Sequence, residues 1–87
     1  MKMIILIVKD HDADTVTQTL TTSEYRVTRV ASTGGFLRSG VVTLLLGVDD
    51  DRVDPVIKMV RYKLGFSSSG EKRATLFVVP VERFEQV

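Results

Sequence analysis

Apolar residues fall into short runs along the chain, and the runs are separated by polar segments. The first run, "MIILIV" at 3–8, is rich in isoleucine and valine and is followed at once by "KDHDAD". A short β-branched run with a polar boundary predicts a buried strand. Similar runs at 40–48 ("GVVTLLLGV") and 74–81 ("ATLFVVPV") predict two more strands.

The segment 25–31, "YRVTRVA", alternates between apolar and polar residues instead. Side chains in a strand point alternately to opposite faces, so Tyr25 and Val27 fall on one face and Arg26 and Thr28 on the other. This pattern predicts a further strand.

Helical spacing occurs after the first strand. Asp10 or Asp12 is expected to cap a helix in which Ala13, Val16 and Leu20 recur at i, i+3 and i+7. The segment is rich in threonine, which has a weak helix propensity. We therefore expect packing, and not propensity, to stabilise this helix.

A second apolar stripe at helical spacing follows the third strand; its members are Val53, Val56, Ile57, Val60 and Leu64. Pro55 is tolerated only in a first turn, so the helix should begin between Asp51 and Asp54. Gly65 is suited to its carboxyl-terminal cap.

The order of these elements is β-α-β-β-α-β, which is typical of the ferredoxin-like fold. The sequence thus predicts an α+β protein with one domain, residues 1–87, in which two helices cover one face of a four-stranded antiparallel sheet. The last residues, "ERFEQV", are expected to form a short helical turn.

The other face of this sheet should be polar if it meets water. However, "IILIV", "VVTLLLGV" and "TLFVV" are apolar at both parities. Each aliphatic side chain left in water would forfeit about 1.5–3 kcal/mol. A loop or the tail could cover part of this face, but we expect self-association, because large exposed apolar surfaces mark interfaces.

Composition narrows the classes of function. The 12 Lys and Arg residues balance 11 Asp and Glu residues, giving a net charge of +1, so no bulk charge favours nucleic acid or an anionic membrane. The absence of cysteine excludes disulfides and thiolate metal sites. The first apolar run is too short to span a bilayer, and no cleavage site follows it, which predicts a cytoplasmic protein.

No combination of residues supports catalysis. His11 is the one histidine, and the neighbouring Asp10, Asp12 and Asp14 are interpreted as helix-capping acids. The three consecutive acids at 49–51 lack the alternate spacing of a calcium loop and are interpreted as a solvated helix start. We therefore predict a protein without enzymatic activity, cofactor or metal.

The segment between the second and third strands, "VASTGGFLRSG", is the best candidate for a binding loop. Consecutive glycines allow backbone N–H groups to converge on an anion. Three arginines lie in or beside the segment: Arg26, Arg29 and Arg38. Phe36 and Leu37 are apolar residues at a turn, so they could face a flat ligand or pack on another subunit. Spacing alone leaves both interpretations open.

Four stretches, "MKMII", "RVTRVASTGGFLRSG", "GVDDDRVD" and "ATLFVVPVERFEQ", resemble the P-II-like family of cyclic di-AMP receptors. The resemblance covers nearly the whole chain, and "STGGFLR" is its most specific part. It implies a ferredoxin-like homotrimer that binds the dinucleotide in clefts between subunits. It also implies a protein that signals, without catalysis, to a protein target.

The resemblance also implies which residues bind the ligand: Arg26, Thr28, Gly35, Phe36, Leu37, Gly47, Phe77 and Gln86. Backbone N–H groups and Thr28 would hold phosphate or base edges, and Phe36 would lie along an adenine. We expect neither binding to nucleic acid nor insertion into a membrane.

Two features depart from the family pattern. Val41, Val42 and Thr43 stand where the family usually has Asn-Thr-Thr, which removes a side chain able to bond an adenine edge. The long Gly- and Pro-rich loop before the last strand is shortened to "GFSSSGEKRA". An alternative is therefore a P-II-like oligomer that docks a protein and has lost small-ligand binding.

Overall fold

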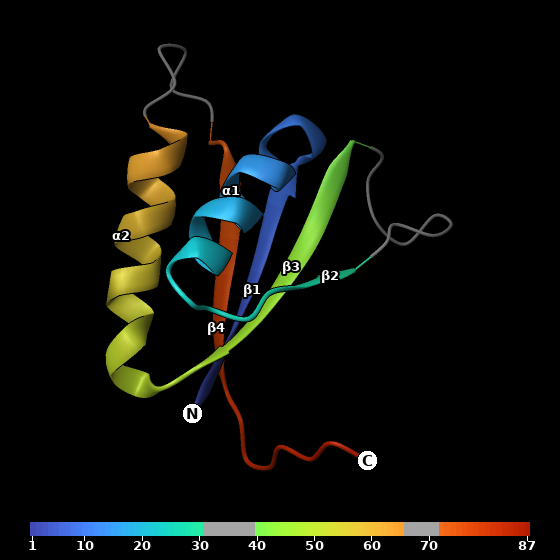
Figure 1. Ribbon diagram of the computed structural model, residues 1–87, viewed down its shortest axis with the longest axis vertical. Helices are drawn as coiled ribbons and strands as arrows, with labels where there is room; N and C mark the ends of the chain where they lie inside the picture. The colour runs from blue at the N-terminus through green and yellow to red at the C-terminus, as the bar shows by residue number, and fades with distance from the viewer. Residues whose placement is uncertain (31–39, 66–71) are drawn as a thin grey trace.

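The computed structural model describes residues 1–30, 40–65 and 72–87, and these form a sheet with helices on one side (Figure 1). The elements in chain order are β1 (Lys2–Lys9), α1 (Asp10–Thr22), β2 (Thr28–Val30), β3 (Val41–Val48), the 3-10 helix η2 (Asp50–Arg52), α2 (Val53–Leu64) and β4 (Ala74–Pro80).

The sheet has the strand order β2-β3-β1-β4, and every neighbouring pair is antiparallel. Both α-helices lie against the same face (Figure 1). The predicted ferredoxin-like α+β fold is confirmed.

The core lies between the helices and the sheet. Alternate residues of β1, namely Ile4, Leu6 and Val8, are buried there. Their partners and the helix residues that cover them are Val42, Leu44, Leu46 and Val48 from β3, Ala13, Val16 and Leu20 from α1, and Val56, Val60 and Leu64 from α2. The first helical stripe predicted from the sequence therefore faces the core, and so does the second except for Ile57, which is half-buried and not among the core residues.

The predicted ends of α2 are confirmed. The helix begins at Val53, after η2, so Pro55 occupies its first turn. Gly65 follows its last residue with a φ of 69°, a conformation that glycine adopts without steric cost, and donates its N–H to the carbonyl of Arg61.

The predicted cap of α1 is wrong. The helix begins at Asp10, its N-cap residue is Lys9, and no side chain caps it. Asp12 is instead buried, and its carboxylate accepts a hydrogen bond from Arg73 at 2.7 Å. Asp12 lies within the first turn of the helix, and its carboxylate forms a charge-assisted hydrogen bond with Arg73 instead of capping the helix.

β2 is shorter than the strand predicted at 25–31, although residues 31–39 lie outside the described residues. Pairing begins only at Thr28, opposite Leu45. The N–H of Tyr25 bonds to the carbonyl of Leu20, so this part of the chain completes the end of α1. Tyr25 and Val27, which the alternation placed on one face, both pack against the core.

The tail after β4 has no regular secondary structure in residues 81–87, so the predicted helical turn is wrong. β4 ends at Pro80, and Val81 donates its N–H to the carbonyl of Met1. A single helical turn is costly to nucleate without packing, and this segment instead runs across the end of the sheet.

The face of the sheet opposite the helices is named the open face here. Its apolar residues are Met3, Ile5, Ile7, Leu45, Phe77 and Val79. Phe77 retains 52% of its exposure, and neither α-helix lies on this side (Figure 1). The predicted apolar character of both faces is confirmed, while self-association stays a prediction.

Candidate functional site

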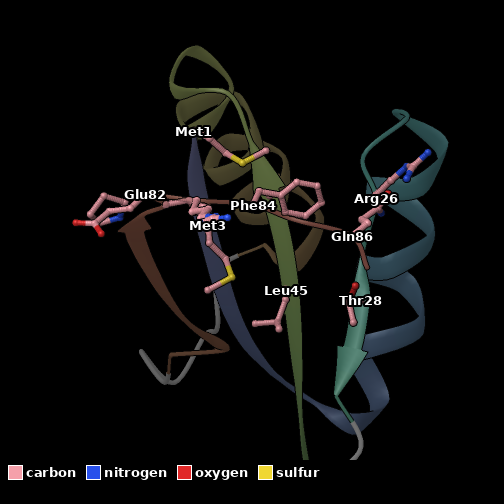
Figure 2. Close-up of a pocket in the computed structure, with 12 residues that line it drawn as sticks. Met1, Met3, Arg26, Thr28, Leu45, Glu82, Phe84 and Gln86 are labelled. Atoms are coloured by element: carbon pink, nitrogen blue, oxygen red, sulfur yellow. The ribbon is translucent and has the colours of Figure 1, made fainter.

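A pocket of about 1130 Å³ lies at the end of the open face that is crossed by the tail (Figure 2). Its walls come from four parts of the chain. Met1 and Met3 belong to the start of β1, Arg26 and Thr28 to β2 and the segment before it, and Leu45 and Gly47 to β3. Pro80 comes from the end of β4, and the tail supplies Val81, Glu82, Arg83, Phe84 and Gln86.

Sheet register explains why these residues meet. Thr28 lies opposite Leu45, and Gly47 lies opposite Met3. Paired residues project to the same face, so all four side-chain positions point away from the helices. Arg26, two residues before Thr28, continues the same side of the chain.

Gly47 keeps the floor of the pocket open. A Cβ added there would lie 3.8 Å from the Cε of Met1, which is an ordinary van der Waals contact. The backbone at this position is not in the left-handed region, since the described glycines with positive φ are Gly40 and Gly65. The position thus tolerates a side chain, but any large side chain would occupy the pocket.

The structure brings four of the eight predicted ligand-binding residues into this pocket: Arg26, Thr28, Gly47 and Gln86. Phe77 lies on the open face opposite Ile5 but does not line the pocket. Gly35, Phe36 and Leu37 lie outside the described residues.

Arg26 is one of the two arginines that line the pocket. It forms no ion pair with any residue in the described part of the chain. Arg83, the other arginine of the pocket, is paired with Glu85 at 2.6 Å. A guanidinium group binds phosphate through parallel N–H donors, so Arg26 is suited to a phosphorylated ligand.

The remaining walls combine two further kinds of contact. The hydroxyl of Thr28 and the amide of Gln86 can donate and accept hydrogen bonds. Met1, Met3 and Phe84 supply apolar surface (Figure 2). The arrangement suits a small molecule that has an anionic group, polar edges and a flat apolar part.

Sequence reasoning named Gln86 in the tail but missed the other tail residues that line the pocket. Glu82, Arg83 and Phe84 were expected in a helical turn, and Met1 and Met3 were considered only as part of a strand. Their meeting depends on how the tail crosses the end of the sheet, which no local pattern encodes. The pair "RF" directly before "EQ" was the available clue, because it places an exposed aromatic residue two positions from Gln86.

The histidine and the acidic residues that were considered for catalysis or metal binding do not line this pocket. His11 Nε2 is 3.6 Å from Asp12 Oδ2 at the start of α1, which follows the opposite end of β1 from the pocket. Asp50 and Asp51 are exposed in η2. Within residues 1–30, 40–65 and 72–87, no three His, Asp or Glu side chains are grouped to hold a metal ion.

None of the helices in the described part of the chain combines the length and apolar character needed to cross a membrane.

Comparison with known proteins adds two findings. The family model described as "Cyclic-di-AMP receptor" matches residues 1–65. The crystal structure of a functionally unknown protein from Pediococcus pentosaceus ATCC 25745 is similar, with a TM-score of 0.76 and 30% sequence identity. That alignment covers 99% of this chain and 96% of the other chain. The family match includes Arg26, Thr28 and Gly47 and ends before the tail.

Proposed function

The chain belongs to the cyclic-di-AMP receptor family, and on this premise we propose that it is a non-enzymatic signalling protein that binds cyclic di-AMP in the pocket at the end of the open face. The observation that carries this proposal is the meeting of Arg26, Thr28, Gly47 and Gln86 in one cavity, although they come from three separate parts of the sequence.

The pocket offers groups that would suit a phosphate and the edge of an adenine of the dinucleotide. Arg26 and Thr28 would bind a phosphate, and the amide of Gln86 would bond to the edge of an adenine. Gly47 leaves room for the ligand. The remaining predicted residues, Gly35, Phe36, Leu37 and Phe77, would complete the site from the binding loop and from β4.

We further propose that the site lies at clefts of a homotrimer. The open face carries exposed or half-buried apolar side chains, among them Ile5, Leu45 and Phe77. Covering each of them would contribute about 1.5–3 kcal/mol. Because the pocket lies at the end of this same face, association through the open face would bring a neighbouring copy beside it.

The first test is isothermal titration calorimetry of the purified protein against cyclic di-AMP, ATP and cyclic di-GMP. We expect cyclic di-AMP to bind most tightly. Arg26→Ala should weaken binding by roughly 10- to 100-fold, because hydrogen bonds to a charged group contribute about 1.5–3 kcal/mol. Arg61→Ala, at an exposed arginine on α2, serves as the matched control and should bind like wild type.

One feature favours a second candidate, a P-II-like oligomer that docks a protein without a small ligand. Val41, the first residue of β3, offers no hydrogen bond where the family usually has asparagine. Absence of heat with all three nucleotides, from a folded sample, would contradict cyclic di-AMP binding and support this second candidate.

A further inference from the structure

We propose that Phe84 in the tail is the residue on which an adenine base of the ligand stacks, so that the tail forms one wall of the binding site. This inference rests on the proposed function and names a specificity-determining residue for it. Phe84 was not among the ligand-binding residues predicted from the sequence.

The exposure of Phe84 is the first observation. Its side chain lines the pocket but retains 65% of its exposure. It is absent from the hydrophobic core, whose members come from the helices and the sheet. A phenyl ring that is not needed for packing within its own chain has a face available to a ligand.

The position of the ring is the second observation. Figure 2 shows Phe84 between the two methionines, Met1 and Met3, and Gln86, on the same side of the pocket as the tail. A base lying against the ring would have its edge toward Gln86, while Arg26 and Thr28 remain available for the phosphate. A purine has two apolar faces and a polar edge, and this wall of the pocket offers a partner for each.

The segment that carries the ring is tied to the sheet on its N-terminal side, and the residues beside the ring contact each other. Val81 donates its N–H to the carbonyl of Met1 at 3.2 Å, which ties the start of the tail to β1. Arg83 and Glu85, the two neighbours of Phe84, are ion-paired at 2.6 Å. Arg83 is engaged in this exposed ion pair, whereas Arg26 forms no ion pair within the described residues.

The alternative role for an exposed apolar ring is packing on a second copy of the chain. The two roles differ in what they require of the side chain. Stacking requires an aromatic face, whereas packing requires only apolar volume. Variants that keep the volume and remove the π-face therefore separate the two roles.

The experiment is calorimetric titration with cyclic di-AMP of wild type and of Phe84→Ala, Phe84→Leu and Phe84→Tyr. Base stacking on an aromatic side chain contributes enough for a roughly 5- to 100-fold loss of affinity in Phe84→Ala. Phe84→Leu should show a similar loss and Phe84→Tyr should bind like wild type. Tyr62→Ala, which removes an aromatic ring that is 90% exposed on α2, is the matched control and should not change affinity.

A second measurement observes the contact directly. The chain contains no tryptophan, so Phe84→Trp introduces a single fluorophore into the pocket. Stacking of adenine on the indole should quench its emission as cyclic di-AMP is added. Tyr62→Trp should show no quenching over the same range of concentration. Circular dichroism and light scattering on each variant confirm that its fold and mass match those of wild type.

The outcomes separate the two claims. Tight binding by wild type, together with unchanged affinity in Phe84→Ala and unquenched Phe84→Trp, would overturn the role of Phe84 and leave the proposed function standing. Recovery of affinity by Phe84→Leu would assign the ring to packing and overturn stacking. If wild type binds no cyclic di-AMP, the proposed function fails and the inference fails with it.

Discussion

At the scale of single residues, the pocket depends on the missing side chain of Gly47 as well as on the side chains that line it. Gly47 occupies a strand residue whose neighbours on β3 are aliphatic, and its backbone needs no special conformation. Glycine is generally unfavourable within a strand, because it loses more conformational entropy on folding than other residues and has no side chain to pack. Gly47 lies opposite Met3 at the floor of the pocket, where the absence of a side chain leaves space for a ligand.

Gly47→Val tests that reason. Valine fits a strand well, so the midpoint of thermal unfolding should stay the same or rise. Its branched side chain would project into the pocket, and an overpacked site typically costs about 1–3 kcal/mol, so cyclic di-AMP should bind roughly 5- to 100-fold more weakly.

Gly47→Ala is the graded control for this substitution, because its Cβ makes only an ordinary contact with Met1 and should cause a smaller loss. Melting curves and titrations on both variants check the expectation. A Gly47→Val protein that binds like wild type would show that the ligand does not use this floor.

At the scale of elements, the ends of helices and strands differ in how well sequence predicts them. The end of α2 follows from Pro55 and Gly65, whose backbone preferences are local. The start of α1 does not, because Asp12 has a partner 61 residues away in the chain. The shortening of β2 likewise reflects a bond between Tyr25 and the end of α1.

The residues of the candidate site likewise differ in how well the sequence predicts them. Arg26, Thr28, Gly47 and Gln86 were named from a resemblance, and the alternation of residues 25–31 placed the first two on the same face of a strand. The tail contacts depend on the path of residues 81–87 across the sheet, for which the sequence has no periodic pattern. Local preferences therefore specify the scaffold, while long-range contacts complete the pocket.

The contact between Asp12 and Arg73 joins three elements, and we expect it to stabilise the fold. Arg73 bonds to the Asp12 carboxylate in α1 and to the carbonyl of Leu64 at the end of α2, and it stands directly before β4. The Asp12 side chain is only 10% exposed. Removing its partner would leave a desolvated charge, which is costly in a protein interior.

Arg73→Met should therefore lower the free energy of unfolding by roughly 1–3 kcal/mol in urea denaturation at fixed protein concentration. Arg29→Met is the matched control, because Arg29 pairs with Asp14 at the same 2.7 Å distance but on the surface, where such pairs contribute about 0–1 kcal/mol. The double variant Asp12→Ala/Arg73→Met should be less destabilised than the sum of its single variants. Equal losses in Arg73→Met and Arg29→Met would contradict a stabilising role for burial.

At the scale of the whole molecule, the account rests on a sheet that is apolar on both faces and has helices on only one. The helices bury Ile4, Leu6 and Val8 of β1, while Met3, Ile5 and Ile7 of the same strand face the other way. Within the described residues, neither α-helix lies on that second face (Figure 1). Association of identical copies is the arrangement that would cover it and also place a neighbour beside the pocket.

Native mass spectrometry of the wild-type protein with cyclic di-AMP tests this central claim most directly, because one spectrum reports both the number of copies and the number of bound ligands. The account predicts a species with three times the 9.7 kDa mass of the chain that carries up to three molecules of cyclic di-AMP. A folded monomer at micromolar concentration, or a trimer that binds no cyclic di-AMP at saturating concentration, would contradict it.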